Sequence, residues 1–133
     1  MSVVLDTHVW LWWILGQPEL PAVQRRALDA LAVDEAPRLP AICLWEAQML
    51  HAKGRLELKL PFDRWLIEAS QPAIVQIAPL DVRVVIAADD LPKTFHGDPA
   101  DRIIVATARA LDLPLATHDR QIRRSRTVNL WRP

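Results

Sequence analysis

Cysteine is almost absent from this sequence, since Cys43 is the single example among 133 residues. One thiol cannot form a disulfide within the chain, which excludes a disulfide scaffold and favours a reducing, cytoplasmic setting. Long apolar runs are also missing, because the apolar N-terminal stretch is interrupted at Asp6 and ends by Gly16. That stretch has no basic leader and is too short to span a bilayer, so we expect no signal peptide and no membrane segment.

Net charge is missing as well, since 16 Lys and Arg balance 16 Asp and Glu. A neutral chain is not expected to bind nucleic acid avidly and without specificity. The charges are unevenly placed, however, with an acidic excess over residues 1–101 and a basic excess over residues 102–133. The basic end is either a solvated tail or a local contact for phosphates.

What the sequence does contain is typical of one ordinary globular domain, with 51% apolar and 24% charged residues and no repeat or linker. Apolar periodicity and Gly or Pro punctuation predict helices at 7–15, 21–33, 42–52, 62–70, 82–91, 99–111 and 119–124. Extended segments are predicted at 3–5, 38–41, 74–77, 114–117 and 127–130. This alternation predicts an α/β fold of three layers (α/β/α), with a central, mainly parallel sheet of four or five strands.

Two acids follow predicted strands directly. Asp6 ends the strand 3–5, and Asp119 comes shortly after the strand 114–117. In parallel α/β sheets the chemistry gathers at the carboxyl ends of the strands, so both acids are candidates for a site. Each is equally explained as the N-cap of the helix that follows. Thr7 and Thr117 place hydroxyl groups beside these acids, suited to holding a carboxylate or a metal-bound water.

Glu46 is unusual because its helical neighbours three and four positions away are all apolar: Ile42, Cys43, Met49 and Leu50. We therefore expect Glu46 on the stripe that faces the core. A buried carboxylate without a partner is costly. It needs an ion-pair partner, a proton or a metal ion.

Asp98 and Asp101 open the helix 99–111, with Pro99 at its first position. Asp98 fits the N-cap, and capping explains Asp101 at the third helical position too. Asp101 differs in orientation, because Ile104 and Ala108 of the same helix are expected to point inward. We place Asp101 at the inner edge of the helix start.

Taken together, these acids indicate more than each does alone. Carboxylates that share a site raise one another's pKa unless a cation is present, and hard oxygen ligands suit Mg²⁺ or Mn²⁺. Zinc is not favoured, because the four histidines are scattered and Cys43 has no partner thiol. We expect His96 and His118 near the site, at most as substrate contacts.

Three segments resemble a PIN domain: LDTHVWLWW near the start, LWEAQMLHAKGRLEL in the middle, and HGDPADRIIVATARALDLPLATHD near the end. More closely, they are similar to the VapC-like toxins of bacterial and archaeal toxin–antitoxin pairs. This resemblance implies a single PIN domain over residues 1–133 that cuts RNA with Mg²⁺ or Mn²⁺. It implies catalytic, metal-binding acids at Asp6, Glu46, Asp101 and Asp119, with Asp98 as a neighbour.

The resemblance also implies partners. These are an RNA substrate, a small VapB-like antitoxin protein and a second copy of the chain in a homodimer. The candidate RNA contacts are the basic residues Arg102, Arg120, Arg123 and Arg124. Trp10, Trp12 and Trp13 make the first helix apolar nearly all round, so either the core or another chain covers part of that surface.

Two other functions are weaker alternatives. An aspartyl-phosphate phosphatase with Asp6 as nucleophile needs a second Asp two residues on, where this chain has His8. A receiver domain needs an acidic pair at the first strand and a late Lys, yet no Lys follows Lys93. The alternative that stays open is a catalytically silent PIN-like module that binds protein or RNA.

Overall fold

The computed structural model describes residues 2–133. Its strands are β1 (Val4–Leu5), β2 (Arg38–Pro40), β3 (Gln76–Ala78) and β4 (Leu115–Ala116). Its α-helices are α1 (Thr7–Ile14), α2 (Ala22–Asp29), α3 (Ile42–Ala52), α4 (Phe62–Ala69), α5 (Val82–Asp89), α6 (Pro99–Leu111) and α7 (Arg120–Ser125), with a 3₁₀ turn at Val33–Glu35.

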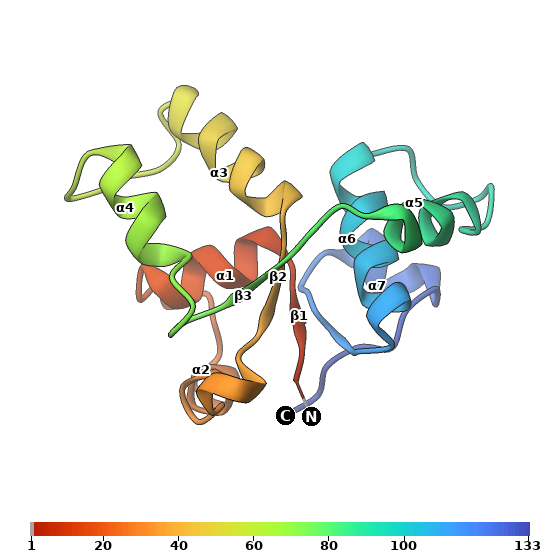
Figure 1. Cartoon of the computed structure of the whole chain (residues 1–133), viewed down its shortest axis with the longest axis horizontal. Helices are drawn as coiled ribbons and strands as arrows, with labels where there is room; N and C mark the ends of the chain where they lie inside the picture. The colour runs from red at the N-terminus through yellow and green to blue at the C-terminus, as the bar shows by residue number, and fades with distance from the viewer. Residues whose placement is uncertain (1) are drawn as a thin grey trace.

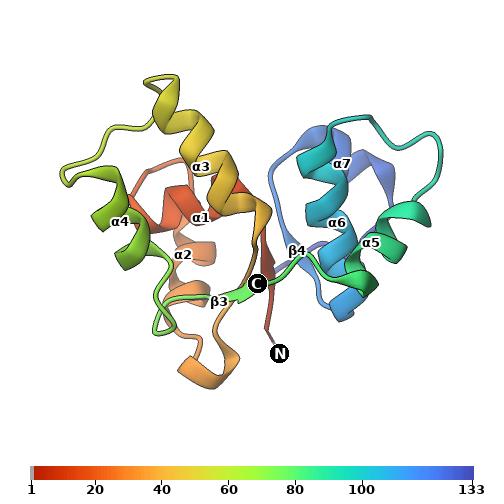
Figure 2. The same cartoon turned by 45° about the horizontal axis from the view of Figure 1, so that its top comes forward.

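The four strands form one sheet in the order β3-β2-β1-β4, and every neighbouring pair is parallel. Figure 1 shows α1 to α4 on one side of the strands and α5 to α7 on the other, and the turned view in Figure 2 shows the same division. The predicted three-layer fold with a parallel sheet is therefore confirmed, with four strands.

The strand order contains a reversal that decides where a site can form. The chain adds β2 and then β3 on one side of β1, and then returns to place β4 on the other side. Right-handed crossovers put the helices on opposite faces on either side of such a reversal, which opens a crevice at the carboxyl ends of the strands. Leu5 pairs with Ala116, so the residues that leave β1 and β4 emerge side by side.

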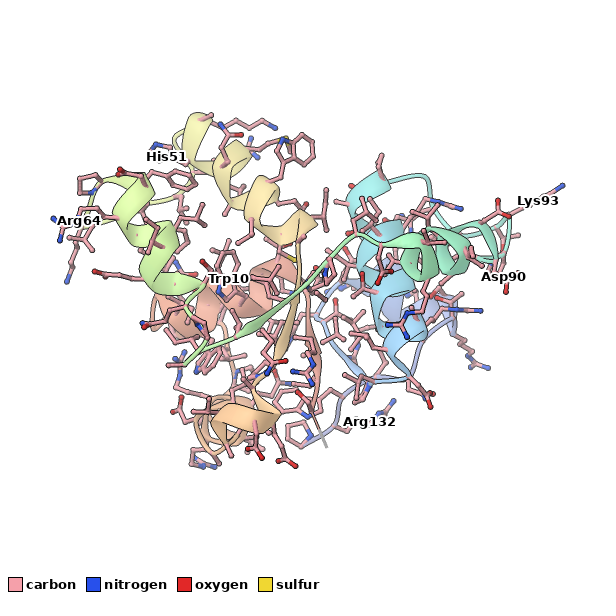
Figure 3. The ribbon with its side chains drawn as sticks, viewed as in Figure 1. Trp10, His51, Arg64, Asp90, Lys93 and Arg132 are labelled. Carbon is pink, nitrogen blue, oxygen red and sulfur yellow. The ribbon has the colours of Figure 1, made fainter. Side chains whose placement is uncertain are left out.

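The core explains why these segments take these conformations. Val4, Leu5, Leu39 and Leu115 are fully buried, as expected for short strands covered on both faces. The helix α6 buries Ile104, among others, along one face against the sheet. Trp10 of α1 is also fully buried, and Figure 3 shows it inside the molecule, where its Nε1 donates to the carbonyl of Ala69.

Several element boundaries differ from the predictions. The predicted helix 21–33 ends at Asp29 and gives way to the 3₁₀ turn, and the predicted helix 82–91 ends at Asp89. The predicted strand 74–77 begins at Gln76. The predicted terminal strand 127–130 does not form a strand. Only one parallel bridge forms there, between Leu130 and Leu115.

Candidate metal site

Asp6 stands at the point where β1 becomes α1 and is held on both carboxylate oxygens. One oxygen accepts the backbone N–H of Thr7 at 2.8 Å, which makes Asp6 the N-cap of α1. The other accepts the hydroxyl of Thr117, which follows β4, at 2.6 Å. Asp6 is buried, with 4% of the residue's surface exposed. The capping role and a role at a site are therefore compatible.

Glu46 projects from α3 toward Asp6, and the hydroxyl of Thr7 donates to its Oε1. Our expectation that Glu46 lies on the buried stripe needs correction. Cys43 and Ala47 form the buried face of α3, whereas Glu46 is only half-buried beside that face. The apolar neighbours misled the prediction because Met49 and Leu50 line a pocket, and Leu50 packs against the core only in part.

Asp98 and Asp101 take different roles at the start of α6. Asp98 is exposed and caps the helix, because its Oδ1 accepts the backbone N–H of Asp101 at 3.1 Å. Asp101 is half-buried at the inner edge, as predicted, and its Oδ2 lies 2.7 Å from Nε2 of His96.

Asp119 is the N-cap of α7, since its Oδ1 accepts the backbone N–H of Ile122 at 2.9 Å. Its own backbone N–H donates to the hydroxyl of Thr117 at 3.1 Å. Thr117 thus connects Asp6 to Asp119 across the crevice between β1 and β4.

The four acids predicted to act together border a single pocket of about 310 Å³. Its lining residues are Asp6, Thr7, His8, Leu11, Glu46, Met49, Leu50, Lys53, Asp101 and Asp119. We call it the acidic pocket. It opens at the carboxyl ends of β1 and β4, where the strand order reverses.

Burial and mutual repulsion act on these carboxylates. Burial is the largest cause that raises the pKa of Glu46, and the negative charges of Asp6, Asp101 and Asp98 raise it further, against the lowering effect of the Thr7 bond. Burial likewise raises the pKa of Asp101 most, with Asp6, Asp98 and Asp119 adding to the effect, while the hydrogen bond from His96 lowers it. The pocket therefore resists full ionisation unless positive charge enters it.

The residues present fit a divalent cation. Within residues 2–133, no Lys or Arg forms an ion pair with any of the four acids, and only His8 and His96 approach them. Several carboxylate oxygens directed at one small pocket form the ligand set that Mg²⁺ and Mn²⁺ take.

Two histidine arrangements could not be foreseen from sequence spacing. Nε2 of His8 accepts the backbone N–H of His118 at 2.9 Å, so a neutral His8 carries its proton on Nδ1, which lies 3.5 Å from Asp6. His118 lies beside the site as predicted, with Nε2 bonded to Gln24 at 2.9 Å and its ring 5.2 Å from Trp12. These partners are about a hundred residues apart in sequence, and no local pattern signals them.

The tryptophans of α1 also have partners within the chain. Trp13 donates from Nε1 to Asp29 at 2.8 Å, and the ring of Trp12 lies 4.8 Å from that of His8. Both are half-buried against the core. Crowding of these rings therefore does not by itself require a second chain.

Three of the four basic candidates lie on α7, and the fourth, Arg102, lies on α6. Arg102 donates to the carbonyl of Ala88 at 3.4 Å and lies over the ring of Phe95, away from the pocket lining. Arg123 donates to the carbonyl of Thr117 at 3.2 Å, which brings α7 close to the site. Arg120 and Arg124 are exposed on α7. Their contact with RNA stays a prediction.

Comparison with known proteins supplies the family. A family model described as "PIN domain" matches residues 3–127. The chain is 34% identical to "Ribonuclease VapC22" of Mycobacterium tuberculosis, over 98% of each chain. Among residues 2–133, no helix is long and apolar enough to cross a membrane.

Solved structures share the fold at low identity. VapBC2 from Rickettsia felis, bound to a promoter DNA fragment, matches with a TM-score of 0.71 at 18% identity over 98% of each chain. FitAcB from Neisseria gonorrhoeae matches with a TM-score of 0.63 at 20% identity, covering 98% of this chain and 97% of that one. The sequence matches and the shared fold lead to one conclusion: this chain belongs to the PIN-domain family.

Proposed function

We propose that this chain is a metal-dependent endoribonuclease that acts as the toxin of a type II toxin–antitoxin pair. The observation that carries the proposal is the acidic pocket, in which Asp6, Glu46, Asp101 and Asp119 border one cavity. The 34% identity to a protein named a ribonuclease supports RNA as the substrate class. Mg²⁺ or Mn²⁺ is the proposed cofactor.

The pocket residues divide the work of holding a cation and a substrate. A divalent ion bound there supplies a Lewis acid that stabilises the negative charge developing on a phosphodiester. Asp6 is fixed by Thr7 and Thr117, so its carboxylate costs little reorganisation when it binds. Glu46, Asp101 and Asp119 complete the ligand set from α3, α6 and the start of α7. The raised pKa values of Glu46 and Asp101 make ion binding compete with protonation.

Thr7 and Thr117 are supporting residues in this proposal, because each hydroxyl holds a proposed ligand and neither needs to contact the ion. Lys53 also lines the pocket and is available to contact a phosphate. The basic residues Arg120, Arg123 and Arg124 on α7 extend a positive surface beside the site for the RNA backbone.

We further propose that the chain assembles with a small VapB-like protein and with a second copy of itself. The supporting likeness is to solved structures described as VapBC2 and FitAcB. The remaining alternative, a catalytically silent PIN-like module, is disfavoured because all four acids are present and directed at one cavity.

The test is cleavage of assorted RNAs by the purified protein with Mg²⁺, with Mn²⁺ or with EDTA. Cleavage should require a divalent ion, and Asp6→Asn or Asp101→Asn should lower its rate by about a hundredfold or more, exceeding the usual loss for a merely supporting residue. The matched control is Asp112→Asn, at the other end of α6. Asp112 is exposed in the left-handed region (φ 53°), which Asn tolerates. Full activity in EDTA, or in both pocket variants, would refute the proposal.

A further inference from the structure

His96 and His8 are the two imidazoles beside the four acids in the part of the chain that the structure describes, and His96 makes the shorter contact. It precedes α6 in the loop that leads to Asp98, and its ring stacks on Phe95 with 4.4 Å between ring centroids. Phe95 is buried, so this stacking fixes the orientation of the imidazole. Nε2 of His96 is thereby directed at Oδ2 of Asp101, 2.7 Å away.

His96, Asp101 and Asp119 each offer one ligand atom, and these atoms all lie within 4.8 Å of one another. Around a six-coordinate ion with bonds of about 2.1 Å, adjacent ligand atoms lie about 3.0 Å apart and opposite ones about 4.2 Å apart. The separation of His96 from Asp101 is close to that of adjacent ligands. The whole group fits around one ion with little movement.

These three residues stand apart from Asp6 and Glu46, which α1 and α3 hold through Thr7. The oxygen of Asp119 that caps α7 is Oδ1, and its carboxylate has a second oxygen to offer. The α6 and α7 side of the acid cluster therefore offers one nitrogen and two carboxylates to a single ion. On the β1 side, Nδ1 of His8 lies 3.5 Å from Oδ2 of Asp6.

Nitrogen changes which ion is preferred. Mg²⁺ takes oxygen ligands and gives up its water reluctantly, whereas imidazole suits divalent transition metals, whose affinities rise from Mn²⁺ to Co²⁺. We propose that His96 is a direct metal ligand and that, with Asp101 and Asp119, it forms a position selective for a divalent transition metal over Mg²⁺. The inference rests on the proposed metal-dependent function and deepens it by naming the ion class.

A different role for His96 predicts a different result. If His96 only orients Asp101 through its hydrogen bond, its loss should weaken Mg²⁺ and Mn²⁺ binding alike. If it is a ligand, His96→Gln replaces a nitrogen by an amide oxygen that Mg²⁺ accepts. Affinity for Mn²⁺ should then fall by at least about tenfold, because losing a residue that only supports a metal ligand already lowers metal affinity by about that much. Affinity for Mg²⁺ should change by less than about threefold.

The direct probe is pulsed electron paramagnetic resonance of Mn²⁺ bound to the full chain, which detects ¹⁴N of a ligating imidazole and needs no variant. We expect ¹⁴N coupling in the wild type, its loss in His96→Gln, and its retention in His51→Gln. His51 is exposed at the end of α3, and Figure 3 shows it far from the sheet. Titrations of each protein with Mn²⁺, Co²⁺ and Mg²⁺ accompany the spectra.

Three outcomes would overturn the inference: no ¹⁴N coupling in the wild type, coupling that persists in His96→Gln, or equal losses of Mg²⁺ and Mn²⁺ affinity in that variant. If such a protein still cleaves RNA in a metal-dependent way, the proposed function stands and only the role of His96 falls. If neither ion binds the wild type, both the inference and the metal-dependent function fail.

Discussion

Glu46 lowers the stability of the metal-free fold because of its position in the acidic pocket. Burial first, and then the charges of Asp6, Asp101 and Asp98, raise its pKa in the folded chain. A carboxyl whose pKa is higher in the folded than in the unfolded chain destabilises the fold when it is ionised. This cost is complete at pH values above the folded-state pKa and disappears as the pH falls below the unfolded-state pKa. Without metal, Glu46 therefore works against folding at neutral pH.

Glu46→Gln removes this charge and keeps an oxygen that accepts the hydroxyl of Thr7. In EDTA at neutral pH, the variant should melt at a higher temperature than the wild type, because no ionised carboxylate then opposes folding at this position. The difference should shrink as the pH falls toward 4.5, the ordinary value for Glu. Melting curves across this pH range check the sign. A strongly destabilised variant in EDTA would show that Glu46 is a structural partner and that its place in the metal site is wrong.

Among the elements, the start of α6 gives two neighbouring acids, Asp98 and Asp101, different roles. Asp98→Ala removes the cap on the N–H of Asp101 and should cost about 1 kcal/mol of unfolding free energy while reducing RNA cleavage only modestly. Asp101→Ala should abolish cleavage with a smaller effect on stability. Chemical denaturation and cleavage rates of the two variants measure this. Exchanged phenotypes would assign the ligand role to Asp98.

Helix boundaries were predictable wherever the signal is local. The bounds of α6 agree with the sequence because Asp98 caps it, Pro99 begins it and Ile104 keeps its apolar period. Strand ends were less predictable, since pairing partners define them: the apolar stretch 127–130 looks like a strand yet only Leu130 finds a bridge. Local sequence does not contain the register of a distant partner.

The same distinction holds for the candidate site. Asp6 and Asp119 could be placed because acids after parallel strands converge at one edge of the sheet. The half-buried position of Glu46 could not, because the same apolar neighbours fit a core stripe and a pocket wall equally well. The bond between His96 and Asp101 depends on the path of the loop before α6, which no periodicity reports.

For the whole molecule, exposed apolar side chains indicate a surface that another chain can cover. Trp12 and Trp13 are half-buried within the chain, whereas Val82, Val85 and Ile86 of α5 are exposed, by 74% in the case of Val82. We predict a homodimer that co-purifies with a small protein encoded beside it. Light scattering of the purified chain, and mass spectrometry of what accompanies it, are the measurements. A monomer without a bound partner would contradict this.

The proposed function requires that the acidic pocket hold a divalent cation between the strand ends and the starts of α6 and α7. Crystals grown with Mn²⁺ and measured at a wavelength where manganese scatters anomalously would locate the ion directly. We expect an anomalous peak within about 2.5 Å of carboxylate oxygens from this pocket, and we expect it to be reduced or absent in Asp101→Asn crystals. A peak bound elsewhere, or no peak in the pocket at saturating Mn²⁺, would contradict it.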